Sequence, residues 1–180
     1  MNIYGKILKL FGWSVTVSVP DYPKAIICVA PHTSNWDFIL GKLAYASVGR
    51  HGGFLMKESW FFWPLGPIFR SIGGVPVPRR KKNYSLVNLL IERFRTEKHL
   101  VLAITPEGTR KPTSRWHTGF LEIARRANVP LILAAIDFGS RQVLLQKEFH
   151  PSGNNEEDLR EIKKYYSQFT GKHPTNFLTD

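Results

Sequence analysis

The sequence of 180 residues contains one cysteine, Cys28, which excludes an intramolecular disulfide framework and any zinc site built from several cysteines. No apolar run approaches the ~20 residues that span a bilayer, because the longest candidate, 60–69, is short and carries two prolines. Lys6 and Lys9 interrupt the apolar N-terminus, which excludes an ordinary signal peptide. No two histidines stand at metal-ligand spacing, so we expect neither a metal nor a bound cofactor.

Acidic residues are also scarce, since 14 aspartates and glutamates face 25 lysines and arginines and leave a net charge of +11. The excess is concentrated in residues 1–90, which hold 11 basic and 3 acidic side chains. Such a field favours an anionic partner. Nucleic acid, a phosphate-bearing substrate and an anionic membrane all fit the charge alone.

What the chain does contain is an alternation of apolar, β-branched runs with segments of helical periodicity, the pattern of an α/β sheet with helical crossovers. We therefore predict one α/β domain over residues 1–180, with a mostly parallel central sheet flanked by helices. Strand 25–30 is apolar almost throughout, so both of its faces should be covered. The expected strands are 25–30, 53–56, 74–77, 100–105, 131–138 and 142–149; the expected helices are 1–14, 36–43, 87–94, 120–127 and 155–170.

The first helix, 1–14, is amphipathic by its spacing. Four apolar residues follow the i, i+3, i+4, i+7 rule while two lysines face the other way: Tyr4, Ile7, Leu8, Phe11, Lys6 and Lys9. Two interpretations stay open for it. It packs on the core as a short helix, or it lies in a membrane interface with Trp13 at the level of the headgroups.

We expect the chemistry at the carboxyl ends of the strands, where ligands of open α/β sheets bind. His32 follows strand 25–30, and Asp37 lies five positions later, inside the next helix. A helix cap within residues 33–35 leaves His32 on the preceding turn, free to fold back towards Asp37. The carboxylate can then fix one imidazole nitrogen and leave the other as a general base for a hydroxyl. The alternative is a loop histidine and an unrelated acid in the first turn of a helix.

A second polar turn, 106–110, follows strand 100–105. Gly108 lets backbone N–H groups approach an anion, Thr109 adds a hydroxyl, and Arg110 can bind a phosphate with two hydrogen bonds. Glu107 suits a hydroxyl of the same ligand or orients Arg110. The alternative is a charged turn in which Glu107 and Arg110 pair in solvent.

Together these turns resemble the conserved blocks of the glycerolipid acyltransferases, typified by 1-acylglycerol-3-phosphate acyltransferase. The first block of that family is a histidine, four residues and an aspartate, as at His32 and Asp37. The family's third block, proline-glutamate-glycine-threonine-arginine, is complete. The second block resembles residues 57–77, with Arg79 at the usual basic position; the third lies at 106–110, and the fourth resembles 129–132. The resemblance therefore covers roughly residues 25–138.

The resemblance implies a glycerol-3-phosphate acyltransferase-like fold and transfer of a fatty acyl group from acyl-CoA or acyl carrier protein to a hydroxyl of a lysophospholipid or related lipid. It implies His32 as the general base, oriented by Asp37. It places the polar end of the acceptor at Glu107, Gly108, Thr109, Arg110 and Arg79. Lysophosphatidic acid, glycerol phosphate and other lyso-lipids stay open as acceptors. No covalent acyl-enzyme is expected, since Cys28 sits inside an apolar strand.

Three features bear on partners and location. The consecutive aromatics 60–63 cannot all point inward, so some should contact lipid or line an acyl groove. The basic run 79–82 can bind anionic headgroups or be a solvated cluster. His117 lies just past the third block, from which it can approach the site, but we expect it at the surface.

We therefore predict a cytoplasmic enzyme held peripherally at the inner face of an anionic membrane, with no nucleic-acid partner. A basic nucleic-acid-binding module is the first alternative, disfavoured because a recognition motif is missing. The second is a catalytically silent lipid-binding protein, disfavoured because both His32 and Asp37 are present.

Overall fold

The computed structural model describes residues 2–77 and 85–179, so Arg79 and the basic run 79–82 lie outside the described residues. Helices and strands alternate along much of the chain. In order they are α1 (Ile3–Leu10), β1 (Ser14–Val17), β2 (Lys24–Ala30), α2 (Asn35–Ser47), β3 (Gly53–Lys57), η1 (Glu58–Trp60), α3 (Leu65–Ser71), β4 (Gly74–Val77), α4 (Leu86–Thr96), β5 (Leu100–Ile104), α5 (Gly119–Ala127), β6 (Leu131–Asp137), β7 (Gln142–Phe149), α6 (Asn155–Tyr166) and η2 (Pro174–Asn176). The alternation is broken where β1 is followed directly by β2 and where β6 is followed directly by β7.

The strands form one seven-stranded sheet in the order β1-β7-β6-β2-β5-β3-β4. Strands β6, β2, β5, β3 and β4 pair in parallel, β7 runs antiparallel to β6, and β1 is parallel to β7. The predicted fold class, a mostly parallel α/β domain, is confirmed. The prediction missed β1, although its polar and apolar residues alternate as in a half-buried strand, and α3, which has Gly66 and Pro67 inside it.

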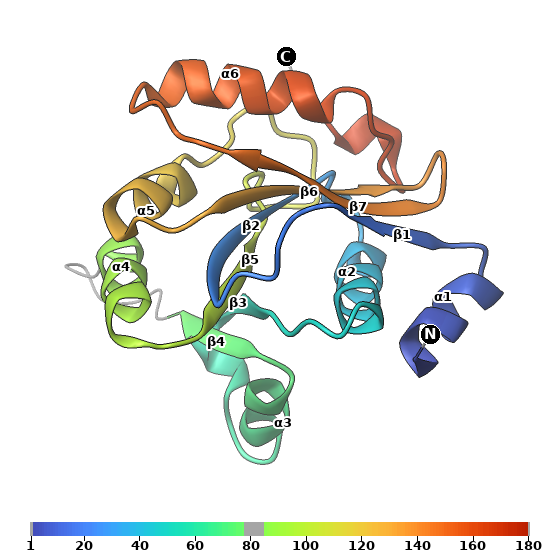
Figure 1. Ribbon diagram of the computed structural model, residues 1–180, viewed down its shortest axis with the longest axis horizontal. Coiled ribbons are helices and arrows are strands. Elements are labelled where there is room, and N and C mark those ends of the chain that lie inside the picture. The colour runs from blue at the N-terminus through green and yellow to red at the C-terminus, as the bar shows by residue number, and fades with distance from the viewer. Residues whose placement is uncertain (1, 78–84, 180) are drawn as a thin grey trace.

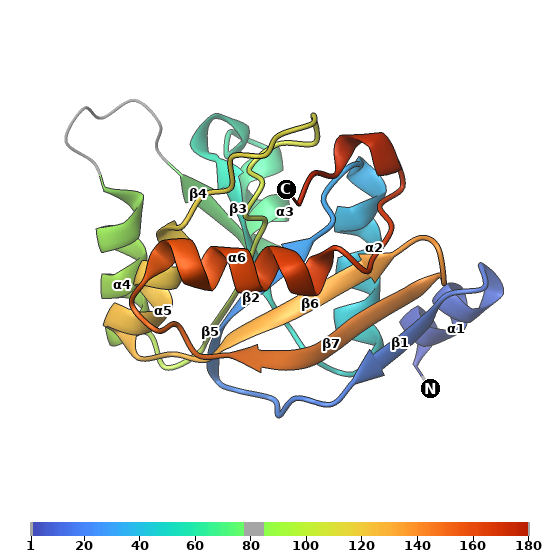
Figure 2. The same cartoon turned by 90° about the horizontal axis from the view of Figure 1, so that it is seen from above.

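Helices cover both faces of the sheet (Figure 1), as the apolar run of β2 predicts. Ile26 and Cys28 of β2 belong to a core cluster with residues of α4, α5 and α6. Ala25 and Ile27 belong to a second cluster with residues of α1 and α2. Figure 2 shows α6 lying across β2 and β6, on the opposite side of the sheet from α2 in Figure 1.

The C-terminal third of the chain holds the sheet and its polar turns together. The fully buried Tyr166 of α6 donates from its hydroxyl to the carbonyl oxygen of Cys28 at 2.6 Å. Beyond α6, the chain returns to the carboxyl edge of the sheet. There the N–H of His173 donates to Oγ1 of Thr33 at 3.2 Å, and Nδ2 of Asn176 donates to the carbonyl oxygen of Arg110 at 3.1 Å.

Helix α1 packs on α2 through a narrow contact. Leu8 is its one buried residue, and Nδ2 of Asn2 donates to the carbonyl oxygen of Ala46 at 2.7 Å. Trp13 does not stand free as a headgroup anchor would, because its ring packs edge-on against Phe138 with centroids 5.0 Å apart. Within residues 2–77 and 85–179, no helix is both long and apolar enough to cross a bilayer. The large apolar residues exposed on α1 are Ile3, Tyr4 and Leu10, and Phe11, which follows the helix, is also exposed.

Candidate active site

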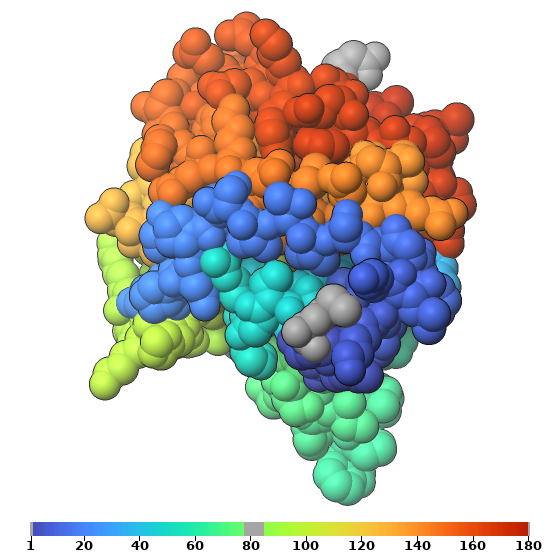
Figure 3. All heavy atoms as spheres, turned by 45° about the vertical axis from the view of Figure 1, so that its right-hand side comes forward, coloured from blue at the N-terminus to red at the C-terminus, as the bar shows by residue number. Residues whose placement is uncertain are grey.

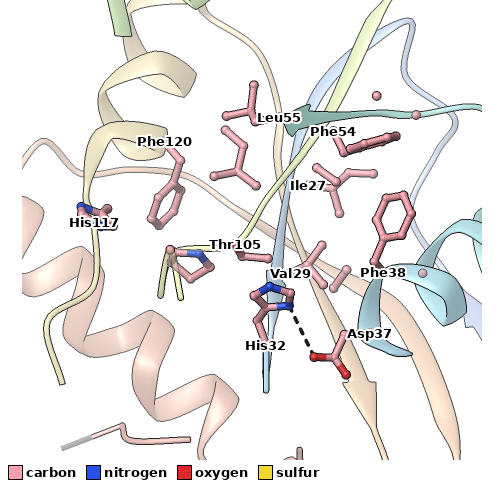
Figure 4. A pocket seen from close by; sticks show the side chains of 18 of the residues that line it. Ile27, Val29, His32, Asp37, Phe38, Phe54, Leu55, Thr105, His117 and Phe120 are labelled. Carbon is pink, nitrogen blue, oxygen red and sulfur yellow. Dashed lines mark ion pairs between the residues drawn. The ribbon is translucent and has the colours of Figure 1, made fainter. Parts of the chain in front are cut away.

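The turn between β2 and α2 brings His32 and Asp37 together. Ser34 is the N-cap of α2, and Asp37 reaches back from the first turn so that its Oδ2 accepts the N–H groups of Thr33 and Ser34, both at 2.7 Å. Oδ1 of Asp37 accepts the Ser34 hydroxyl at 2.8 Å. Nδ1 of His32 lies 3.4 Å from Oδ2 of Asp37 (Figure 4). The predicted fold-back of His32 towards the acid is therefore present.

Asp37 is buried, at 3% exposure, yet its hydrogen bonds keep it ionised. Burial alone would raise the pKa of Asp37, but the interaction with His32 and the hydrogen bonds from Ser34 and Thr33 outweigh burial and lower that pKa. A charged Asp37 favours the tautomer that carries its proton on Nδ1 of His32. The Nε2 atom of His32 is then the basic nitrogen.

His32 and Asp37 stand in the wall of a cavity of about 730 Å³ at the carboxyl ends of β2 and β5. A volume of that size lies within the range of small-molecule sites. Figure 4 shows His32 between aromatic side chains of α2 and β3 on one side and of α5 on the other. An apolar cavity beside a base can hold a long hydrocarbon chain next to a reacting hydroxyl. The apolar lining includes Ile27, Val29, Phe38, Phe54, Leu55 and Phe120.

Glu107 lies beneath His32 and does not line this cavity. It is 2% exposed, and its Oε1 accepts the backbone N–H of His32 at 2.7 Å. Its buried Oε2 has no hydrogen-bond partner within the described part of the chain. Burial raises the pKa of Glu107 to about 8, the bond from His32 opposes the rise, and the negative charge of Asp37 adds to it. The side chain thus supports the His32 backbone and forms no pair with Arg110.

The rest of the 106–110 turn is hydrogen-bonded within itself. The N–H of Gly108 donates to the carbonyl oxygen of Thr105 at 3.2 Å, and Oγ1 of Thr109 accepts the N–H of Lys111 at 3.1 Å. Gly108 lines the cavity, whereas Thr109 and Arg110 do not, and Arg110 is exposed. The structure therefore brings His32, Asp37 and Gly108 to one cavity and leaves Arg110 outside its lining.

Three further ionisable residues, Lys42, Tyr45 and His117, line the cavity. Nζ of Lys42 donates to the carbonyl oxygens of Gly52 and Ile72, at 2.9 and 2.8 Å, and burial lowers the pKa of Lys42. His117 is exposed as expected, but it stands at the cavity. Its position just past the third block is the sequence signal that allowed the approach to the site.

Neither a metal site nor a thiol nucleophile accompanies His32. Across 2–77 and 85–179, no group of three or more His, Cys, Asp or Glu side chains is arranged to hold a metal ion. Cys28 is fully buried, and burial raises the pKa of its thiol to about 12. A thiol in that state is not a nucleophile at neutral pH.

The family is decided by comparison with protein-family models, because the Acyltransferase model matches residues 15–137. The chain belongs to the acyltransferase family. This acyltransferase is similar in structure to the 1-acyl-sn-glycerophosphate (LPA) acyltransferase PlsC from Thermotoga maritima, with a TM-score of 0.60 and 22% sequence identity. The similarity covers 92% of this chain and 74% of that chain. No curated protein sequence matches the acyltransferase.

Proposed function

We propose that this acyltransferase moves a fatty acyl group from an acyl-CoA or acyl carrier protein thioester to a hydroxyl of a lysophospholipid or related lipid. The observation that carries the proposal is the 3.4 Å contact between His32 and the buried Asp37 in the wall of an apolar cavity. The fold shared with a protein named for 1-acyl-sn-glycerophosphate supports this class of acceptor.

In the proposed reaction, Nε2 of His32 takes the proton of the acceptor hydroxyl while its oxygen attacks the carbonyl carbon of the thioester. The charge of Asp37 stabilises the imidazolium that forms. Collapse of the tetrahedral intermediate breaks the carbon–sulfur bond, and the leaving thiolate takes the proton from His32. The apolar walls, with Phe38 and Phe54, hold the acyl chain.

The polar end of the acceptor is proposed to approach from the 106–110 turn. Arg110 is exposed there, and a guanidinium at the rim can form two hydrogen bonds with a phosphate as it enters. Gly108 and Thr109 belong to the same turn, and Glu107 acts indirectly by holding His32. The contribution of Arg79, which lies outside the described residues, remains a proposal from the family resemblance.

The reaction is tested with purified protein, a panel of acyl-CoA and acyl carrier protein donors, several lyso-lipid acceptors, and product identification by mass spectrometry. We expect His32→Ala to lose about 10²–10⁴-fold in kcat, the usual contribution of a general base. Asp37→Asn should lose about 10²-fold, because an amide cannot stabilise the imidazolium. The matched control is His99→Ala, which removes an exposed histidine and should leave the rate unchanged. A folded His32→Ala protein that keeps most of its activity would refute the proposal.

We also propose that the protein binds an anionic membrane through α1, α2 and the η1–α3 segment. Figure 3 shows the residues of α3 projecting from the body of the molecule. Trp63 is 83% exposed, and interfacial tryptophans are typical of membrane contact. Every large exposed hydrophobic residue found in the described ranges falls between positions 3 and 72: Ile3, Tyr4, Leu10, Phe11, Trp36, Phe38, Ile39, Val48, Trp60, Phe62, Trp63, Ile68 and Ile72.

Sedimentation with lipid vesicles tests this surface. Deletion of 2–13 would also uncover the core contact of Leu8, so point substitutions are sharper. We expect Trp63→Ser, or Leu10→Ser with Phe11→Ser, to weaken binding about tenfold, since each change removes one or two large apolar side chains from the interface. The control, Gln168→Ser, changes an exposed residue just after α6 and should bind like the unmodified protein. Equal sedimentation of all four proteins would contradict the assignment.

A further inference from the structure

We propose that His117 forms an anion-binding subsite in the cavity wall, where its imidazole contacts the phosphate or another anionic group of the acceptor lipid. The inference rests on the proposed function, because it requires the acceptor hydroxyl to reach His32. It goes beyond that function by assigning the acceptor's charge to a residue that lines the cavity, and not only to Arg110, which does not line it.

The backbone holds His117 in place from two sides. The preceding residue, Trp116, is buried, with its ring 6.0 Å from that of Tyr166 and 5.9 Å from that of Phe177. The N–H of His117 donates to the carbonyl oxygen of Pro106 at 2.8 Å, which ties it to the 106–110 turn. With Trp116 fixed in the core, the next side chain lines the cavity. In Figure 4 His117 and His32 stand on separate walls of the cavity.

Gly108 keeps the space that the His117 ring occupies. A Cβ at position 108 would lie 2.8 Å from Cδ2 and 2.9 Å from Nε2 of His117, closer than carbon atoms tolerate. Gly108 also has a φ of +64°, which L side chains rarely adopt. The glycine of the turn therefore serves the placement of His117, since its own N–H is already bonded to Thr105.

Among the cavity-lining side chains of the described residues that can carry positive charge, His117 is the one without a role in catalysis or a hydrogen bond of its own. Within the described lining, the side chains that can carry positive charge are His32, Lys42 and His117. His32 must be neutral to act as a base, and the ammonium of Lys42 already donates to two carbonyl oxygens. The His117 ring has no hydrogen bond or ion pair with any residue in 2–77 or 85–179. An imidazole can donate to an anion and, when protonated, make that bond charge-assisted.

The experiment measures KM for the acceptor and for the acyl donor in the full-length protein, with lysophosphatidic acid and an uncharged monoacylglycerol as acceptors. His117→Gln should raise KM for lysophosphatidic acid about tenfold or more, as expected for the loss of one charge-assisted hydrogen bond. It should change KM for the donor and for monoacylglycerol less than about twofold, because neither presents the anion to this wall. His117→Arg should restore KM for lysophosphatidic acid to within about threefold, since the charge returns.

An unchanged KM for lysophosphatidic acid in His117→Gln would overturn the subsite. So would an equal rise for the charged and uncharged acceptors, an arginine variant that rescues nothing, or an unmodified protein that uses only uncharged acceptors. The His32→Ala variant separates the two proposals. Loss of activity there with no effect of His117→Gln contradicts the subsite alone, whereas full activity of His32→Ala contradicts the proposed function.

Discussion

Two buried carboxylates flank His32, and their hydrogen bonds give them opposite protonation. Asp37 accepts three hydrogen bonds from Thr33 and Ser34 in addition to its contact with His32, so its pKa falls despite burial. Glu107 accepts one, from the His32 backbone, and burial dominates, so its pKa rises to about 8. The interaction with His32 and the further hydrogen-bond donors keep Asp37 charged, whereas Glu107, buried with one donor and near the charge of Asp37, has a raised pKa.

Glu107 makes the stability of the fold depend on pH. The pKa rises from an ordinary 4.5 to about 8 on folding, so between these values the folded chain keeps a proton that the unfolded chain releases. Stability from this group is therefore present below about pH 4.5 and is lost as the pH rises to about 8. Glu107→Gln cannot ionise. We therefore expect its free energy of unfolding to rise relative to that of the unmodified protein by about 2–5 kcal/mol between these two pH values.

Urea denaturation of both proteins at about pH 5 and about pH 8.5 measures this difference. Glu97→Gln is the control, because Glu97 is partly exposed, and its effect should not grow between the two pH values. A stability difference between Glu107→Gln and the unmodified protein that stays constant with pH would show that Glu107 is ionised throughout.

At the scale of elements, α2 shapes the cavity through Gly41. This glycine lines the cavity, and a Cβ there would meet only Cδ1 of Ile136, at 3.6 Å. A small side chain thus fits, and a large one has to enter the space that the acyl chain is proposed to occupy. Because Gly41 leaves open space on the cavity side of α2, a substitution at this position can change the preferred length of the acyl chain without altering His32.

We expect Gly41→Leu to shift the preferred acyl donor to a chain shorter by about two to four carbons, because the side chain fills several ångströms of the cavity. The measurement is the product distribution from a mixture of donors, read by mass spectrometry. Gly41→Ala is the matched control and should keep the original preference, with a gain of up to about 1 kcal/mol from better helix propensity. An unaltered distribution in a folded Gly41→Leu protein would place the acyl chain elsewhere.

At the scale of the whole molecule, positive charge and exposed apolar surface fall in the same half of the chain. Residues 1–90 carry 11 basic and 3 acidic side chains, and the exposed large hydrophobics found in the described ranges lie between positions 3 and 72. A surface of this composition combines apolar insertion with attraction to anionic headgroups.

Vesicle binding should accordingly depend on lipid charge and on salt. We expect binding to anionic vesicles to fall about tenfold between roughly 0.05 and 0.5 M NaCl, because salt screens the attraction, which is worth about 1 kcal/mol per basic residue near the surface. Zwitterionic vesicles are the control and should show weaker binding with little salt dependence. Equal binding to anionic and zwitterionic vesicles at low salt would show that electrostatic attraction does not contribute and that apolar insertion alone holds the protein at the membrane.

The sequence by itself predicted the mostly parallel sheet and six of its seven strands. It gave the fold-back of His32 to Asp37 as one of two interpretations, and the family resemblance favoured it. Both features depend on neighbours in the chain: the apolar run of β2 requires cover on both faces, and a cap at Ser34 sets the acid under the histidine. The prediction missed β1, whose alternating polar and apolar residues fit a strand, and α3, a seven-residue helix with Gly66 and Pro67 inside it.

The tertiary structure alone decided what surrounds His32. Glu107 is 75 residues from His32 in the chain, and the pairing of β2 with β5 brings its carboxyl group to that backbone. Arg110, three residues later, is exposed and does not line the cavity. His117 lines the cavity because Trp116 beside it is buried against Tyr166 and Phe177, a contact between segments far apart in sequence. Local spacing encodes turns and caps, whereas the burial of a carboxylate and the facing of a side chain depend on which strands and helices become neighbours in space.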